Sequence, residues 1–384
     1  MKTLVISTVG TSLLTNCIDQ DIDPDNWLKR LQDTANYTED EINKHCEDVL
    51  ATITELNQRA EEKLYNKETE ISEIRETCAE LNGIYGLYDE KLEQGISDTH
   101  ILITTDTAQG RITSKLIEKF LQDNKLKNTT TCIQPQLSLK SSTAFKEGMA
   151  KVIPYIRDTI EGFQKNQYQI YFNLVGGFKA LQGYFNTIGM FYANEIIYVF
   201  EGSNEVIKIP RLPIKVDIEK IEPFKVQLAM MEQGDVYKSW EKLKDIPRDW
   251  LLEDGQEMTL STWGQLIWSQ CKEELLSNNL LKFPKISYKD SFIDDLKKID
   301  NNLEEKLKLQ EVIAKVAIFL QKSNGDTSPL KNDNGLQYDK YTNMKGDIAH
   351  FRVTKGIRVS CTSSNNNLLL HRYGKEPVVN KNPY

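Results

Sequence analysis

The chain has 384 residues, with 48 Lys and Arg against 56 Asp and Glu, so its formal net charge is −8. This length allows two or three domains with a sizeable core. No apolar run approaches the length that spans a bilayer, and the N-terminus has a strand pattern without a small-residue cleavage site. We therefore expect a cytoplasmic protein without membrane contact. The six cysteines have no paired spacing, which predicts neither disulfides nor a metal site.

Charge is unevenly distributed along the chain. Residues 281–384 hold 18 Lys and Arg against 12 Asp and Glu, a net charge of +6, which leaves 30 against 44, a net charge of −14, for residues 1–280. A basic segment favours a polyanionic partner, although a modest excess is also common on ordinary surfaces.

Three predicted strands each lead into a turn and then a helix. The strands are residues 3–9, 100–105 and 168–175, and the turns after them begin at Gly10, Asp106 and Gly176. Such a turn can be ordinary turn chemistry, but it also points backbone N–H groups at an anion at the start of a helix. Because strand ends in an open parallel sheet share one edge, we expect a phosphate-binding site there.

The region between the first two of these strands has helical periodicity. A capping box at Thr38–Glu41 opens it, and apolar residues then recur at steps of four and three. This pattern predicts one long helix or a helical hairpin at about residues 38–95, inserted within the first domain and used for packing or dimer contact. Two prolines at 210 and 213 mark the end of that domain at about residue 215.

The segments GTSLLTN (10–16), TTDTAQGR (104–111) and NLVGGFK (173–179) resemble the signature segments of CARF domains, the CRISPR-associated Rossmann-like sensors. The resemblance covers residues 1–215 and implies an α/β Rossmann-like fold and a homodimer that binds a cyclic oligoadenylate across its two-fold axis. We favour cyclic tetra-adenylate, although a six-membered ring also fits a two-fold groove. The motifs place these residues at the ligand: Gly10, Thr11, Ser12, Asn16, Thr105, Asp106, Thr107, Gly110, Arg111, Asn173, Gly176, Gly177 and Lys179.

The rest of the chain divides into two parts. Residues 216–281 show helical periodicity without visible chemistry, and we expect a helical connector there. Residues 282–384 are predicted to form two helices followed by short antiparallel strands, which is an α+β pattern.

A predicted hairpin in this last part gathers polar side chains on one face. A three-residue loop at 354–356 would pair Arg352 with Arg358 and His350 with Ser360, whereas a two-residue loop would mix the faces. We favour the three-residue loop. Arginines can offset charge that develops on a phosphodiester, and a histidine can transfer protons near neutral pH. The face therefore predicts either phosphodiester cleavage or nucleic-acid binding without cleavage.

A second hairpin decides whether this face extends further. An odd loop at residues 365–367 would add Arg372 to the face, opposite Ser360, and an even loop would put His371 there instead. We favour the odd loop, which brings three arginines and a histidine together.

The segments ISYKDSFIDDLKKI (286–299), FRVTKGIRVSC (351–361) and LLLHRYGKEPVVN (368–380) resemble the RelE family of toxin endoribonucleases. This resemblance implies ribosome-dependent cleavage of mRNA, in which the 2′-hydroxyl attacks the adjacent phosphate and expels a 5′-hydroxyl. The tyrosine or histidine that many relatives use near the C-terminus has no clear counterpart, which leaves His350 and His371 as candidates for proton transfer. The candidate catalytic residues are His350, Arg352, Lys355, Arg358, Arg372 and Lys375.

Together the two resemblances imply a CARF–RelE fusion, a type III CRISPR-associated mRNA interferase that needs no cofactor. A cyclic oligoadenylate would be its activator, and the ribosome and mRNA its partners. Two alternatives remain: a non-enzymatic regulator that binds nucleic acid under ligand control, and a ring nuclease whose sensor degrades its own activator.

Overall fold

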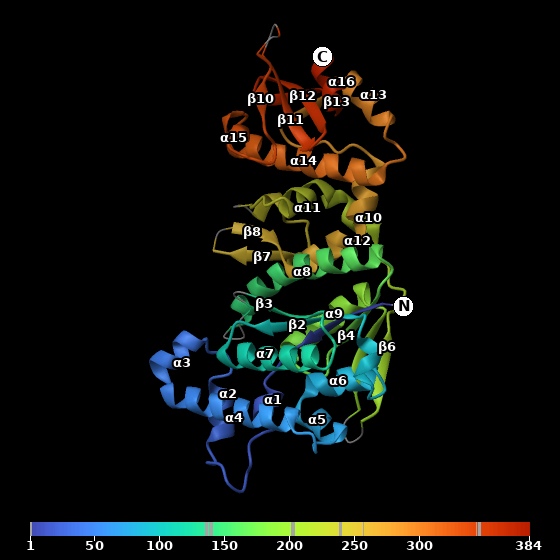
Figure 1. Cartoon of the computed structure of the whole chain (residues 1–384). Helices are drawn as coiled ribbons and strands as arrows, with labels where there is room; N and C mark the ends of the chain where they lie inside the picture. Colours follow the sequence, from blue (N-terminus) through green and yellow to red (C-terminus); the bar gives the residue numbers. More distant parts are fainter. Residues whose placement is uncertain are drawn as a thin grey trace. The chain divides into compact units, whose positions relative to one another are not determined.

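The computed structural model describes residues 2–134, 137, 141–200, 204–237, 240–255, 257–342, 344 and 347–384. The chain divides into two compact units, Met1–Lys215 and Val216–Tyr384. Figure 1 shows the elements of both units in the colours of the sequence. No helix in the described part of the chain is both long and apolar enough to cross a membrane.

The first unit is built on a six-stranded sheet with the order β3-β2-β1-β4-β5-β6. Neighbours from β3 to β5 are parallel, and β6 runs antiparallel to β5 at the edge. This mixed α/β architecture with a mostly parallel sheet agrees with the predicted fold class. The strands are β1 (Thr3–Thr8), β2 (Thr99–Thr105), β3 (Thr129–Gln134), β4 (Gln169–Asn173), β5 (Glu195–Val199) and β6 (Val206–Pro210).

Helices cover both faces of this sheet. Helix α7 (Ala108–Asp123) contacts β2 and β3, and α8 (Ser142–Lys165) and α9 (Lys179–Tyr192) contact β4 from the other side (Figure 1). Buried strands of a parallel sheet need this cover because their apolar residues face both ways. The remaining helices of the unit are α1 (Ser12–Thr15), α2 (Trp27–Asp33), α3 (Glu39–His45), α4 (Glu47–Tyr65), α5 (Ile71–Thr77), α6 (Ala79–Leu87) and the 3₁₀ turn η1 (Leu92–Gly95).

The predicted insertion is helical, but it is a series of separate helices rather than one long helix or a hairpin, and the longest of them is the 19-residue α4. Thr38 and Glu41 form the predicted capping box at the start of α3. The helical chain breaks at Cys46, where φ is −150°, at residues 66–70 between α4 and α5, and at Cys78, where φ is −138°. The four-and-three spacing recurs in these helices because each buries one apolar side: α4 packs against α1 and α7, and α6 packs against the sheet.

The last part of the second unit is α+β, as predicted. Its five-stranded sheet has the order β10-β11-β12-β13-β9, with β9 parallel to β13 and the other pairs antiparallel. The strands are β9 (Ile286–Tyr288), β10 (Asp339–Lys340), β11 (Ile348–Thr354), β12 (Ile357–Ser364) and β13 (Asn367–Lys375). The helices are α13 (Asp290–Lys297), α14 (Leu303–Lys322), α15 (Ser328–Lys331) and α16 (Glu376–Lys381).

The expectation of a purely helical connector is wrong, because residues 216–281 also hold a β-hairpin. Gly255 turns the chain at φ +60°, and the flanking strands have only four residues each, too few for their alternation to stand out in the sequence. The elements are α10 (Ile218–Ile221), η2 (Glu222–Phe224), α11 (Lys225–Glu232), η3 (Trp240–Lys242), η4 (Arg248–Trp250), β7 (Leu251–Asp254), β8 (Glu257–Leu260) and α12 (Thr262–Asn278).

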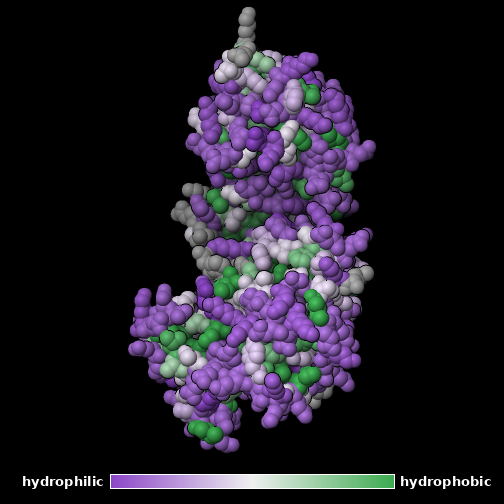
Figure 2. All heavy atoms as spheres, viewed as in Figure 1, coloured by the Kyte–Doolittle hydropathy of each residue, from purple (hydrophilic) through white to green (hydrophobic). Residues whose placement is uncertain are grey.

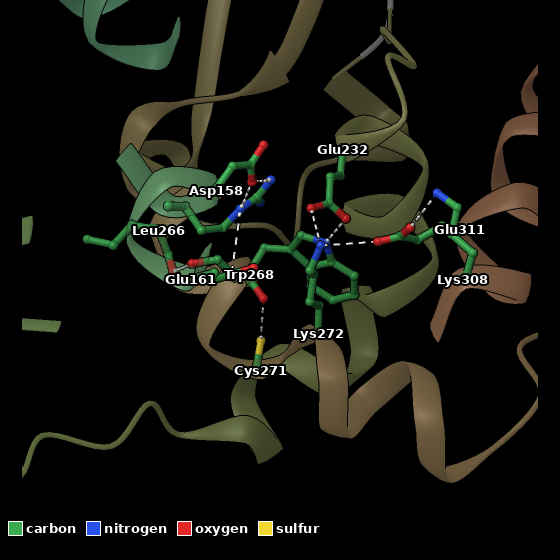
Figure 3. A network of polar contacts seen from close by, with 11 residues as sticks. Asp158, Glu161, Glu232, Leu266, Trp268, Cys271, Lys272, Lys308 and Glu311 are labelled. Atoms are coloured by element: carbon green, nitrogen blue, oxygen red, sulfur yellow. Dashed lines mark hydrogen bonds and ion pairs between the residues drawn. The ribbon is translucent and has the colours of Figure 1, made fainter. Parts of the chain in front are cut away.

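A polar network joins this connector to α14. Lys272 of α12 lies 2.9 Å from Glu232 of α11 and 3.2 Å from Glu311 of α14 (Figure 3). The indole N–H of Trp268 also donates to Glu232, at 2.8 Å. Because these charges are largely buried, removing one of them would leave its partner unpaired away from water. One hydrophobic cluster continues from Ile221 to Tyr373, so residues 216–384 form a single packed body.

The visible surface is mostly hydrophilic, with single hydrophobic residues between the polar ones (Figure 2). The most exposed of the large apolar side chains is Ile22, followed by Val378 and Phe200. Scattered exposed apolar residues of this kind are common on folded domains.

Candidate functional site

The carboxyl ends of β1, β2 and β4 share one edge of the first sheet. The three strands are parallel neighbours, with β1 in the middle, so the expectation that three strand ends converge is confirmed. The chain leaves β1 toward β2 and β3 and later returns to β4 on the other side of β1. The carboxyl ends of β1 and β4 therefore form the topological switch point, where open α/β sheets bind ligands.

The turns after β1 and β4, residues 9–12 and 174–178, touch through their backbones; we call them the switch-point turns. A Cβ added at Gly10 would lie 2.9 Å from the Gly177 nitrogen. Gly177 has φ +103°, and a Cβ there would lie 2.8 Å from Thr8 Oγ1. The Thr8 hydroxyl in turn donates to the Gly176 carbonyl at 2.6 Å. Glycine is required at both positions because no side chain fits and Gly177 is left-handed.

A buried carboxylate of the chain itself lies between the switch-point turns. Glu80 of α6 accepts the backbone N–H of Gly10 at 2.7 Å and the hydroxyl of Ser12 at 3.3 Å. Its side chain is fully buried. A Cβ at Gly176 would overlap the Glu80 carboxylate. Two donors of the first turn that the sequence suggested for a ligand anion, the Gly10 N–H and the Ser12 hydroxyl, are thus bonded to Glu80.

The two asparagines of the predicted ligand set hold the insertion in place. The Asn16 amide donates to the Glu76 carbonyl at 2.9 Å. The Asn173 amide is buried and donates to the Glu80 carbonyl at 3.0 Å and to Ser7 Oγ at 3.2 Å. Both side chains therefore position α5 and α6 beside the edge.

The turn after β2 starts α7 with a standard N-cap and presents an ion pair. The Thr107 hydroxyl accepts the Gly110 N–H at 3.1 Å and lies 3.1 Å from the Thr105 hydroxyl. Arg111 pairs with Asp106 at 2.5 Å, and its side chain remains 40% exposed. Three residues of the predicted set are buried and stabilise the turn itself: Thr105, Thr107 and Gly110. Asp106 and Arg111 are partly exposed, so a ligand can reach them.

Lys179 and Thr11 complete the predicted set. Lys179 is the first residue of α9, is exposed, and forms no ion pair with any residue that the structure describes. Thr11 is partly exposed just before α1. An ammonium group at the start of a 14-residue helix adds to the positive end of the helix dipole, which favours an anion there.

In the second unit the predicted polar face forms with the predicted pairing. Arg352 lies opposite Arg358, His350 opposite Ser360, and Ser360 opposite Arg372. We call these five residues the arginine face. It lies on β11, β12 and β13, the centre of the five-stranded sheet.

Both predicted loop lengths are wrong, although the pairing is right. Each hairpin has a two-residue loop, and a β-bulge restores the register, between Arg352 and Thr354 in the first hairpin and opposite Ser360 and Cys361 in the second. Each bulge adds one residue to a strand, which has the same effect on the faces as one more residue in the loop. Loops at 355–356 and 365–366 therefore give the same face as the predicted odd loops.

The second bulge also settles the place of His371. Cys361 pairs with Leu370 and Ser360 with Arg372, so His371 is the extra residue, and it is buried. Its Nε2 lies 2.8 Å from the Thr362 hydroxyl. The alternative in which His371 replaces Arg372 opposite Ser360 is wrong.

His350, Arg358 and Glu376 form a linked group on the arginine face. Arg358 lies 3.1 Å from His350 Nε2 and 2.7 Å from the Glu376 carboxylate. A guanidinium can only donate, so Nε2 of His350 must be the unprotonated nitrogen. Burial, and then the charge of Arg358, lower the pKa of His350 below its usual value. His350 is therefore neutral at pH 7 and able to accept a proton.

Several buried nitrogen atoms of this region have no hydrogen-bond partner among the described residues. Arg352 Nε, Arg358 Nε and His350 Nδ1 are buried atoms without a partner in the described structure, and so is His371 Nδ1. Buried donors in folded proteins are normally satisfied. A phosphate group offers several acceptor oxygens to neighbouring guanidinium groups, and it matches the donors of Arg352 and Arg358.

Arg372 belongs to the face but is already paired. Its guanidinium donates two hydrogen bonds to Asp295, at 2.7 and 3.1 Å. Asp295 is buried; burial raises its pKa, but the bonds from Arg372 and then Lys298 outweigh this and hold the pKa below the usual value. Arg372 therefore joins β13 to α13, and its charge is neutralised. Lys355 and Lys375, the other predicted residues, are exposed at strand ends.

The C-terminal segment lies along this site, which the sequence did not indicate. The Ser360 hydroxyl donates to the Pro383 carbonyl at 2.6 Å, and the Tyr341 hydroxyl donates to Asn380 at 2.8 Å. The Tyr384 ring meets the His371 ring edge-on, with centroids 5.7 Å apart. Among the residues that the structure describes, no group of three or more His, Cys, Asp or Glu could hold a metal ion.

Comparison with known proteins supports part of this picture. No curated protein matches the chain. A solved structure of a copper-bound mutant toxin from Helicobacter pylori is 18% identical, covers 25% of this chain and 99% of its own, and has a TM-score of 0.19. Residues 75–212, which include α6, the β2 turn and the switch-point turn after β4, match the family model described as CRISPR-associated protein (Cas_APE2256), a CARF-type family.

Proposed function

We propose that the chain is an ancillary effector of type III CRISPR defence. Its first unit, as a homodimer, binds a cyclic oligoadenylate, with cyclic tetra-adenylate favoured, and residues 282–384 cleave mRNA on the ribosome. The sensor half is supported by the family match over residues 75–212 and by the three strand-end turns at one edge of the sheet, two of them at the switch point. Lys179 and Arg111 supply positive charge for the ligand's phosphates.

The ribonuclease half rests on one observation, the unsatisfied buried donors of Arg352 and Arg358 beside a neutral His350. In the proposed reaction the two guanidinium groups bind the phosphodiester of the RNA and offset the negative charge that grows on it. One such donor typically contributes about 3 kcal/mol to the transition state.

Proton transfer completes the proposed reaction. The 2′-hydroxyl oxygen attacks phosphorus, the bond to the 5′-oxygen breaks, and the products are a 2′,3′-cyclic phosphate and a 5′-hydroxyl. When the Arg358 guanidinium turns from His350 Nε2 to the phosphate, Nε2 is free to accept the proton of the 2′-hydroxyl, and its lowered pKa keeps His350 neutral at pH 7 before this step. The leaving 5′-oxygen needs a proton, and Arg352 and Arg358 stabilise it until water supplies one.

Activation requires two arrangements of the dimer that differ in affinity for the ligand. A ligand shifts such an equilibrium only by the ratio of its two affinities. The connector helices α11 and α12 are joined to α14 through Lys272, so a change at the connector would move the body that carries the arginine face.

A cleavage assay tests the proposal. Purified protein, programmed ribosomes and mRNA are mixed with cyclic tri-, tetra-, penta- or hexa-adenylate, and new 5′-hydroxyl ends are mapped. We expect cutting with one ring size only and none without ribosomes. Arg358→Ala should abolish cutting and leave ligand affinity unchanged. Retention of RNA without new ends would identify a non-enzymatic regulator, and loss of labelled ligand on incubation with the protein alone would identify a ring nuclease.

A further inference from the structure

Glu80 stands at the centre of the edge where the ligand is expected, and it carries the sign of charge that a phosphate ligand would carry. It is the only charged residue in α6, the stretch AELNGIYGL, and its side chain is fully buried. A buried carboxylate is costly unless it is hydrogen-bonded. The Gly10 N–H, the Ser12 hydroxyl and the Cys78 thiol all point to its two oxygens, at 2.7, 3.3 and 3.2 Å.

The surroundings of Glu80 leave little room for it to withdraw. Gly176 must lack a side chain because the carboxylate fills that space, and Gly83, one turn further along α6, must lack one because Asn173 fills the space there. Asn173 also holds the Glu80 carbonyl, at 3.0 Å. Ser12 is held from both sides, since its oxygen also accepts the Ala79 N–H at 3.1 Å. The carboxylate is thus part of the edge itself.

We propose that Glu80 determines how the ligand sits at the switch point by excluding phosphate from the turn after β1. This inference rests on the proposed sensor function and adds the orientation of the ligand. Two donors of the β1 turn, the Gly10 N–H and the Ser12 hydroxyl, are already used by Glu80, and its charge repels a second anion. An uncharged part of the oligoadenylate, a ribose or an adenine, therefore faces this turn. The phosphates face the exposed cations Arg111 and Lys179 instead.

The proposal predicts that removing the charge tightens binding. Glu80→Gln keeps the acceptor for Gly10 and the length of the side chain but removes the repulsion. With the screening of bulk water, removal of a unit charge about 6 Å from a phosphate implies about threefold tighter binding of cyclic tetra-adenylate, and the weaker screening near a protein surface raises this to about 100-fold. Glu80→Met, which is neutral and of similar length, should also bind more tightly. Glu80→Asp, which keeps the charge, should not.

Calorimetry on the full-length protein with cyclic tetra-adenylate and cyclic hexa-adenylate as probes measures these affinities. Glu76→Gln is the matched control, because it removes one exposed charge from the adjacent helix α5, and we expect its affinity to stay within twofold of the wild type. Thermal unfolding identifies any variant that does not fold. If one of the two neutral variants, Glu80→Gln or Glu80→Met, does not fold, the other is used for the comparison.

Two failures are distinguishable. Wild-type protein that binds neither ring would overturn the proposed sensor function. Wild-type protein that binds, together with a folded Glu80→Gln or Glu80→Met that binds equally or more weakly, would overturn the role of Glu80 alone. Tighter binding by Glu80→Asp as well would also contradict it, because that variant retains the repulsive charge.

Discussion

Arg358 and Glu376 form an ion pair of 2.7 Å that joins β12 to the short C-terminal helix α16. Arg358 is 16% exposed and Glu376 35% exposed, so the pair lies at the rim of the arginine face. The same guanidinium contacts His350, and its Nε has no partner. Glu376 therefore competes with any phosphate for the charge of Arg358.

Replacing Glu376 tests this competition. Glu376→Gln should lower the KM for mRNA on programmed ribosomes by about threefold, because the phosphate no longer displaces a carboxylate from Arg358. We expect kcat to change less than KM. Glu304→Gln, at an exposed position at the start of α14, is the control and should leave both constants unchanged. An increase in KM for Glu376→Gln would mean that Glu376 positions Arg358 for the substrate.

The pair between Arg372 and Asp295 should govern stability more than catalysis. Arg372→Ala leaves the buried Asp295 carboxylate without its main partner, which typically costs about 3 to 5 kcal/mol. Denaturant unfolding should show that Arg372→Ala destabilises the second unit and that adding Asp295→Asn restores much of the loss. Lys298→Ala, which removes an exposed partner of Asp295, should cost less than about 1 kcal/mol.

A stable Arg372→Ala variant that folds like the wild type yet cuts no RNA would contradict this view. Such a variant would support the catalytic role of Arg372 that the resemblance to RelE toxins implies. Cleavage should therefore be compared at equal concentrations of folded protein.

Replacement by alanine should change the stability of the protein in opposite directions at Gly177 and Gly183. Gly177→Ala puts a side chain at φ +103° against Thr8 and should cost about 1 to 3 kcal/mol. Gly183→Ala, in the exposed interior of α9 with open space around its Cβ, should stabilise by about 0.5 to 1 kcal/mol. Thermal unfolding measures both. Equal effects would show that the switch-point turns are not packed as described.

The exposed ammonium at the start of α9 should carry part of the ligand affinity. We expect Lys179→Ala to weaken binding of cyclic tetra-adenylate by about tenfold without a change in melting temperature. Lys127→Ala is the control, because this exposed lysine precedes β3 at the opposite edge of the sheet. Calorimetry compares the two variants. An unchanged affinity for Lys179→Ala would remove α9 from the ligand site.

Acid should destabilise the first unit through His100. This side chain is fully buried beside Tyr88 and Asp98, and burial lowers its pKa to about 3. The unfolded chain takes up a proton near pH 6.5 and the folded chain does not, so stability falls as the pH drops from about 6.5 toward 3. The free energy of unfolding should lose less between pH 7 and pH 5 in His100→Asn than in the wild type. Equal losses would exclude His100 as the cause.

Much of the fold follows from local patterns. The buried runs and glycine turns at Gly10 and Gly176 predicted parallel strands with a shared edge, because parallel strands must end on the same side; that the two strands are direct neighbours is seen only in the fold. The capping box at Thr38 predicted the start of α3, because both of its hydrogen bonds lie within four residues. The hairpin β7–β8 escaped detection because four-residue strands carry too little periodicity.

The arginine face shows how a local prediction can be right for the wrong reason. The pairing of Arg352 with Arg358 requires one residue more than a two-residue loop supplies. The alternation of apolar residues indicated this extra residue. Alternation cannot distinguish a longer loop from a bulge, since both shift the register by one residue. Only the folded hairpin shows which occurs.

The sequence alone determined which segments form the main strands and turns and which arginines share a face of the sheet, since these features depend on neighbours within a few residues. The tertiary structure decided which of those groups are available. Glu80 reaches Gly10 across 70 positions, and Asp295 reaches Arg372 across 77. No local pattern encodes such contacts, because they arise only when packed elements bring a charge out of water and against its partner.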